Sequence, residues 1–197
     1  DALVLGGNAA QKQEWLPRLV AGEAHAALAL EDGTRHDPAA TALTARRDGE
    51  GWLLEGIKRP VFDAGGAALL LVAARTAERI SLFLCPGDAP GVSKAPLRQI
   101  DSRGAATVTF TDCRLPATAL LGAGDQGLSL LEQVLDRGRA VLAAEMLGSA
   151  QQAFETTIEY LKTRVQFDQP IGSFQALQHR AADMLGELEL TRSAVQA

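Results

Sequence analysis

Residues 105–131, AATVTFTDCRLPATALLGAGDQGLSLL, contain the point at which the chain changes from strand patterns to helix patterns. Within 107–111 the apolar Val108 and Phe110 alternate with three threonines, and this period of two is typical of a half-buried β-strand. Glycines follow between residues 122 and 127, and beyond them apolar positions recur every three or four residues. The stretch therefore predicts a β domain that ends near residue 122 and helices after it.

Short apolar runs precede this stretch and are separated by glycine, proline and aspartate. The predicted strands are residues 26–30, 41–46, 52–55, 68–73, 80–85 and 107–111. The later runs are bounded by Gly65-Gly66 and Pro86-Gly87, and the earlier ones fit the same meander through the turn 48–51. We expect an antiparallel sheet, closed as a barrel or packed as a sandwich.

Two long antiparallel helices are predicted after residue 127. The first presents an apolar face made of Leu147, Ala150, Phe154, Ile158 and Leu161. It should end before Pro170, and the second should start at Ser173, a good N-cap, and continue to Ala197. The apolar stripe of this second helix needs partner helices, so we expect the chain to be part of a longer one. A short helix is also predicted over 11–20, and the fold class is α+β.

Charge and composition exclude several classes of protein. The 197 residues carry 19 Lys and Arg against 24 Asp and Glu, a net charge of −5 that argues against nucleic-acid binding. No apolar run reaches the roughly 18 residues of a membrane span. The three histidines have no metal-ligand spacing, so no metal site is predicted. Cys85 and Cys113 are expected to be reduced thiols of a cytoplasmic protein.

Several motifs occur in one order along the chain. They include Gln13–Pro17, Trp52-x-x-x-Gly56-x-Lys58, Phe110–Pro116, Tyr160-x-x-x-Arg164-x-Gln166-Phe167-x-x-Pro170-Ile171-x-x-Phe174-Gln175 and Ala182-Asp183-Met184. In this order the chain resembles the acyl-CoA dehydrogenase family over essentially its whole length. The resemblance implies the end of an N-terminal helical domain (1–23), a central β domain (24–122) and the first helices of a C-terminal bundle (123–197).

The resemblance also implies a function. FAD would be the cofactor, an acyl-CoA thioester the substrate, and the reaction the formation of an α,β double bond. Electrons would pass to an electron-transferring flavoprotein, and the protein would be a homodimer or homotetramer. The family's usual base, a Glu, belongs to a later segment, and its alternative position is occupied here by Gly138. No catalytic residue is therefore named.

The cofactor residues that the resemblance implies fall into two groups. Arg164, Phe167 and Gln175 match positions that reach the neighbouring subunit's FAD, with the Arg toward the diphosphate. Leu28, Leu30, Val61 and Phe62 match positions beside the flavin ring. Leu30 and Phe62 replace residues of the family that commonly carry a hydroxyl, and Asp168 replaces a usual Gly.

The substrate residues implied by the resemblance are His36, Asp136 and Arg139. His36 stands where a Ser commonly faces CoA, and Asp32 replaces a common Pro in the same loop. The spacing of Asp136 and Arg139 equally allows them to pair with each other on the helix surface. Lys58 is interpreted as a solvated charge at a strand end.

Two alternative functions remain open. One is a flavin-less partner subunit of a hetero-oligomer, which keeps Arg164, Phe167 and Gln175 to complete its neighbour's site; Leu30, Pro60 and Phe62 favour it. The other is a flavin monooxygenase or nitroalkane oxidase of the same fold.

Overall fold

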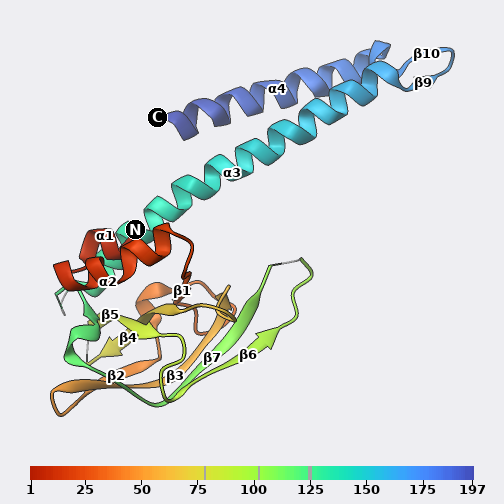
Figure 1. Cartoon of the computed structure of the whole chain (residues 1–197). Coiled ribbons are helices and arrows are strands. Elements are labelled where there is room, and N and C mark those ends of the chain that lie inside the picture. The colour runs from red at the N-terminus through yellow and green to blue at the C-terminus, as the bar shows by residue number, and fades with distance from the viewer. Residues whose placement is uncertain (78, 102, 124–125) are drawn as a thin grey trace. The chain divides into compact units, whose positions relative to one another are not determined.

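The computed structural model describes residues 1–77, 79–101, 103–123 and 126–197. The chain divides into two compact units, Asp1–Val134 and Leu135–Ala197. The predicted succession of a sheet domain and a helical domain is confirmed (Figure 1). Gly124 of the predicted glycine-rich hinge lies outside the described residues.

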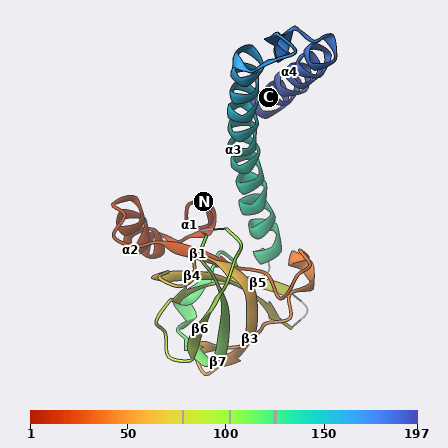
Figure 2. The same cartoon turned by 90° about the vertical axis from the view of Figure 1, so that its right-hand side faces the viewer.

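The first unit is built on a curved sheet whose strands surround one core (Figure 2). Its strands are β1 (Ala26–Ala29), β2 (Thr44–Asp48), β3 (Gly51–Phe62), β4 (Leu69–Thr76), β5 (Arg79–Pro86), β6 (Val92–Leu97), β7 (Ala105–Leu115) and β8 (Leu120–Leu121). They are ordered β6-β7-β3-β2-β4-β5-β8, and β1 pairs with β4. Val108 and Phe110 of β7 are buried, as their alternation with threonine predicted.

The expectation of a purely antiparallel sheet is wrong at β1. This strand lies parallel to β4, with Ala26 opposite Leu69 and Ala29 opposite Val72. Parallel neighbours need a long connection, and the chain from residue 30 to residue 68, which includes the β2–β3 hairpin, provides it. Strand β4 is consequently flanked by β1, β2 and β5, and its residues 69–74 are all buried.

Close packing against β3 requires a glycine at residue 56. Gly56 has a φ of 137° and lies at a register shift of the β3–β7 ladder. A Cβ atom at this position would lie 3.0 Å from Leu43 Cα, which is tighter than ordinary contact. Within the core, Trp52 and Phe83 pack edge to face with ring centroids 5.1 Å apart.

Helices α1 (Ala2–Gly6) and α2 (Ala9–Val20) complete the start of this unit. Asn8 caps α2 by accepting a hydrogen bond from the Gln11 backbone, while the Gln11 side chain accepts one from Asn8 N. The same Gln11 side chain donates to the carbonyls of Thr118 and Leu120, at 2.8 and 3.0 Å. Gln11 therefore joins α2 to the segment that enters β8.

The long helix α3 (Gly127–Thr163) runs into the second unit, which also contains α4 (Gln175–Gln196). The prediction that Ser173 caps α4 is wrong. Ser173 ends a 3-10 turn, Ile171–Ser173, and its hydroxyl donates to Pro170 O at 2.7 Å. Phe174 is the residue that flanks α4 instead.

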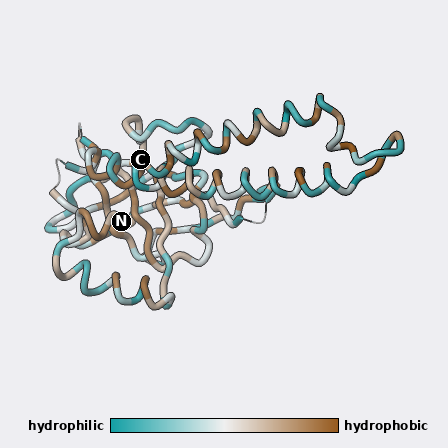
Figure 3. The backbone as a smooth tube through the Cα atoms, turned by 90° about the horizontal axis from the view of Figure 1, so that it is seen from above, coloured by the Kyte–Doolittle hydropathy of each residue, from teal (hydrophilic) through white to brown (hydrophobic). Residues whose placement is uncertain are grey.

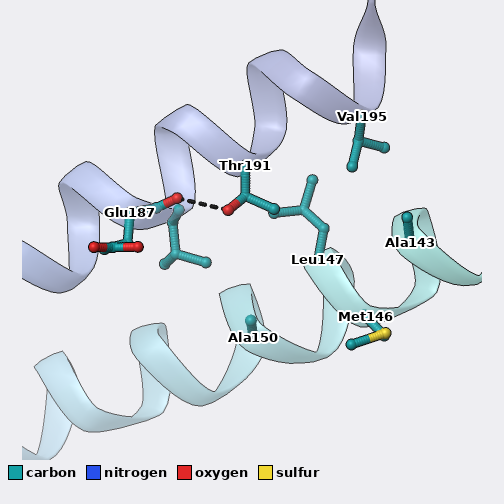
Figure 4. Close-up of a pocket in the computed structure, with 8 residues that line it drawn as sticks. Ala143, Met146, Leu147, Ala150, Glu187, Thr191 and Val195 are labelled. Carbon is teal, nitrogen blue, oxygen red and sulfur yellow. Dashed lines mark hydrogen bonds between the residues drawn. The ribbon is translucent and has the colours of Figure 1, made fainter.

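Helices α3 and α4 lie side by side in the second unit, where Arg192 donates to Gln151 at 2.9 Å. Hydrophobic positions recur between hydrophilic ones along both helices (Figure 3). A groove of about 360 Å³ between them is lined by Ala143, Met146, Leu147, Ala150, Glu187, Leu188, Thr191 and Val195 (Figure 4). Most positions of the predicted apolar stripes, such as Leu147 and Phe154, are half-buried between the two helices, and Leu188 is buried, whereas Met184 is exposed.

None of the described helices combines the length and the apolar character that a membrane crossing needs. Within the described residues, no group of His, Cys, Asp or Glu is arranged to hold a metal ion.

Candidate functional site

Lys58 is the centre of a polar cluster inside the β domain. It lies on β3 and its side chain has an exposed fraction of 0%. Its Nζ donates to Leu30 O at 2.8 Å and to the Thr41 hydroxyl, and forms an ion pair with Asp32 Oδ1 at 2.7 Å. The interpretation of Lys58 as a solvated charge is wrong, because the strand turns this side chain inward to polar partners from distant parts of the chain.

Residues 31–42 form a loop, named here the 31–42 loop, that closes around this cluster. The second oxygen of Asp32 accepts a hydrogen bond from Ala42 N at 2.6 Å. Arg75 of β4 donates to Thr41 O at 3.0 Å and to Ala39 O at 3.1 Å. The loop is therefore held at both of its ends by side chains from β3 and β4.

Burial and the neighbouring carboxylates shift the pKa of Lys58 in opposite directions. Burial lowers the pKa of Lys58, because a charged ammonium loses its hydration in the interior, while the hydrogen bond and charge of Asp32, together with the charge of Glu31, act to raise it. A buried charge of this kind is tolerated only when it is paired and hydrogen-bonded. Lys58 and Asp32 therefore depend on each other.

The predicted substrate residue His36 lies on the surface of the 31–42 loop. Its Nδ1 lies 2.7 Å from Glu31 Oε1, and the imidazole is half exposed. The carbonyl of Glu31 accepts a hydrogen bond from Arg59 N at 2.6 Å. The structure thus joins His36, through Glu31, to the start of the 59–62 segment.

The four residues predicted beside a flavin ring lie near one another at β1 and β3 but differ in exposure. Leu30 is nearly buried and Val61 is fully buried, so their side chains belong to the protein interior. Leu28 is half-buried, and Phe62 is 53% exposed. An aromatic ring system could pack on the exposed ring of Phe62, so this part of the chain fits a flavin by apolar contact.

Hydrogen-bond donors for such a ring are scarce in the 59–62 segment. Arg59 N already donates to Glu31 O, and Pro60 has no N–H, so two of the four backbone positions offer no donor. The fit therefore depends on packing more than on hydrogen bonds from this segment.

The second group of predicted cofactor residues lies around a small hairpin in the helical unit. Strands β9 (Val165–Gln166) and β10 (Gln169–Pro170) are joined by Phe167 and Asp168. These two residues have φ values of 53° and 60°, as a type I′ turn requires. Aspartate tolerates this left-handed conformation better than most residues, which explains how Asp168 can stand where the family usually has Gly.

Arg164 before the hairpin, Phe167 in its turn and Gln175 at the start of α4 are all exposed. The carbonyl of Arg164 accepts a hydrogen bond from Ile171 N at 2.8 Å, which closes the turn between α3 and α4. Phe167 is 85% exposed and packs edge to face on Phe174, the residue before Gln175. Among the described residues, the Arg164 guanidinium has no hydrogen-bond or ion-pair partner, so its fork can accept a diphosphate.

Asp136 and Arg139 pair with each other, as the alternative interpretation allowed. Arg139 donates to Asp136 Oδ1 at 2.6 Å, and both side chains are well exposed. Such a surface pair contributes little to stability, so a ligand could separate the two residues at small cost.

Sequence reasoning missed the Lys58 cluster. Lys58 shares the strand parity of the buried Trp52 and Leu54, and this alternation was the available signal for an inward side chain. Its partners Asp32 and Thr41 lie 26 and 17 residues earlier in the chain.

Comparison with known proteins places this fold. Residues 26–113 match the acyl-CoA dehydrogenase middle domain and residues 125–197 the acyl-CoA dehydrogenase C-terminal domain. The chain is 36% identical to isovaleryl-CoA dehydrogenase, mitochondrial, of Pongo abelii, over 99% of this chain and 49% of that protein. It is 34% identical to human short-chain specific acyl-CoA dehydrogenase, mitochondrial, over 94% of this chain and 47% of that protein.

A solved structure agrees with these matches. Glutaryl-CoA dehydrogenase of Mycobacterium smegmatis, in complex with FADH2, superposes with a TM-score of 0.93 at 33% identity, over 98% of this chain and 51% of that chain. The chain thus spans about half the length of the relatives that it matches. Since the two matched domains together account for most of its residues, the chain belongs to the acyl-CoA dehydrogenase family.

Proposed function

We propose that the full-length protein is an FAD-dependent dehydrogenase that introduces an α,β double bond into an acyl-CoA thioester. Family membership supports the reaction class, and the observation that carries the cofactor is the exposed guanidinium of Arg164 beside Phe167. FAD, when bound, accepts the hydrogen that leaves the β-carbon. The residues of this chain would bind FAD and the acyl-CoA thioester and orient them.

Each group of residues would have its own part in this binding. Arg164 would hold the diphosphate of FAD across a subunit interface, with Phe167 and Gln175 beside it. Phe62 and Leu28 would pack against the flavin ring. His36 of the 31–42 loop would contact CoA. Asp136 and Arg139 of α3 would contact it as well. The base that removes the α-proton is assigned to a segment outside these residues, since Gly138 has no side chain to serve.

The test is the visible absorption spectrum of the full-length protein, purified alone, before and after anaerobic addition of a series of acyl-CoA thioesters. A flavin spectrum that one thioester bleaches supports the proposal and begins to define the acyl chain. A flavin spectrum that no thioester bleaches would reject the dehydrogenase activity.

A flavin-less partner subunit is the second candidate function. It is favoured by Arg59 and Pro60, whose backbones offer no free donor, and by the absence of a hydroxyl at Leu30 and Phe62. Such a subunit would supply Arg164 and Phe167 to a flavin-binding neighbour. In that case the protein purified alone has no flavin absorbance, whereas its complex with the neighbour does.

Partners and location complete the proposal. We propose an electron-transferring flavoprotein as electron acceptor and a homodimer or homotetramer as the assembly, because Arg164 can reach a diphosphate only on a neighbouring subunit in this scheme. A cytoplasmic location is proposed from the sequence, although the Pongo abelii and human relatives compared above are both named as mitochondrial.

A further inference from the structure

One buried ammonium group connects the two ends of the 31–42 loop. Lys58 Nζ contacts Leu30 and Asp32 at the start of the loop and Thr41 at its end. Asp32 spans the same gap, because its other carboxylate oxygen accepts from Ala42 N. Contacts of both Lys58 and Asp32, rather than a single hydrogen bond, therefore join the start of the loop to its end.

Because Lys58 is buried, the contacts made by Lys58 and by Asp32 depend on each other. Lys58 is fully buried, whereas the Asp32 side chain is 25% exposed. If the Asp32 charge is removed, the ammonium keeps an uncompensated charge in the interior, which is strongly unfavourable. The protein can relieve this by releasing a proton from Lys58, by moving the Lys58 side chain, or by opening the loop that covers it.

We propose that Lys58 and Asp32 act together as positioning residues, which set the conformation of the 31–42 loop and so place His36 and Glu31 for binding of an acyl-CoA thioester. The binding part of this statement rests on the proposed function. Neither residue touches the reacting atoms in this scheme. Both act through the loop.

The experiment uses the full-length protein with Lys58→Met, Asp32→Asn and the double variant. Hydrogen exchange of backbone amides in residues 33–40 is measured together with the dissociation constant for butyryl-CoA. We expect each single variant to accelerate exchange in the loop. We also expect it to raise the dissociation constant for butyryl-CoA by about tenfold or more, the scale of one lost contact. The double variant should be no worse than either single one, because the two residues form one unit.

Lys94→Met is the matched control. Lys94 lies in the same domain, but its ammonium donates to Ala67 O, at 2.9 Å, and among the described residues it has no hydrogen bond or ion pair with the 31–42 loop. This variant should leave loop exchange and butyryl-CoA affinity unchanged. Asp32→Asn keeps the shape of the side chain, so it remains informative if Lys58→Met fails to fold.

Each outcome decides something different. Loop exchange equal to that of the wild type in Asp32→Asn overturns the proposal. Faster loop exchange with unchanged butyryl-CoA affinity also overturns it, since the loop then has no part in binding. If the wild-type protein binds neither FAD nor butyryl-CoA, the proposed function fails and the binding role with it, while the exchange data still report whether the two residues hold the loop.

Discussion

The sulfur atoms of Cys85 and Cys113 lie 3.9 Å apart in the core of the β domain. The two residues belong to β5 and β7, which are not neighbours in the sheet, so the contact crosses the interior. Both thiols are fully buried. The hydrogen bond with Cys113, followed by burial, raises the pKa of Cys85, so this thiol remains protonated at neutral pH.

Because of this burial, we expect neither cysteine to react with iodoacetamide in the folded protein at neutral pH. The measurement is the intact mass after treatment under native conditions and again in denaturant. Two adducts from these residues should form only after unfolding. Rapid modification of Cys85 in the native state would contradict the arrangement.

The lowered pKa of Lys58 predicts a pH dependence of stability. Its pKa in the folded state lies below the ordinary 10.5, so between these two values the unfolded chain binds more protons than the folded one. The free energy of unfolding therefore rises with pH across this window. Lys58→Met removes this titrating group, so the stability of the wild type relative to the variant should increase from neutral to alkaline pH. Denaturant titrations at several pH values test this, and parallel profiles would refute it.

Gly56→Ala should destabilise the β domain. The new methyl group would crowd Leu43 and force a non-glycine residue to a φ of 137°, at a cost of about 1–3 kcal/mol. Gly65→Ala is the control, because a Cβ there meets nothing within 4 Å. Urea unfolding of both variants measures the difference, and equal stabilities would show that the contact with Leu43 is not limiting.

Asp168→Gly should have two effects at the hairpin. It relieves the left-handed conformation at a φ of 60°, which favours the turn by up to about 1 kcal/mol. It also removes a negative charge next to Phe167, so we expect FAD to be retained more tightly during gel filtration. Asp112→Gly, with a φ of 48° in β7, is the control that relaxes a similar conformation away from this hairpin. Equal FAD retention in the two variants would exclude the charge effect.

Arg164→Ala should weaken FAD retention or dimerisation, because a charge-assisted contact worth about 1.5–3 kcal/mol is lost. Arg164→Lys should recover only part of it, since an ammonium cannot form the two parallel bonds of a guanidinium. Flavin absorbance per subunit and light scattering are the measurements. Arg180→Ala, an exposed arginine of α4, serves as the control. An Arg164→Ala variant with wild-type flavin content and mass would remove the assignment.

Local pattern was enough to predict much of the fold. The alternation around Val108 and Phe110 predicted a strand with those two residues buried, and both are. The parallel pairing of β1 with β4 could not be predicted, because it depends on contacts between residues about forty positions apart. The prediction that Ser173 caps α4 is wrong for a different reason, since the Ser173 hydroxyl donates a hydrogen bond back to Pro170 O in the preceding turn.

In the candidate site, too, contacts between residues close in sequence could be predicted and contacts between distant residues could not. The pairing of Asp136 with Arg139 follows from helical spacing alone and is observed. The Lys58 cluster joins three segments that become neighbours only in the folded sheet. Exposure also needed the structure, since Val61 and Phe62 are adjacent in sequence yet one is fully buried and the other half exposed.

The parallel placement of β1 has a consequence for the order of assembly. The β2–β3 and β4–β5 hairpins join residues that are close in sequence, whereas β1 pairs with β4 across about forty residues, so we expect the β1–β4 pairing to form later. We therefore expect the 31–42 loop to be completed late in folding. If flavin binds beside this strand, only fully assembled chains can take it up, and the yellow colour of a preparation then measures the fraction of molecules that have finished folding.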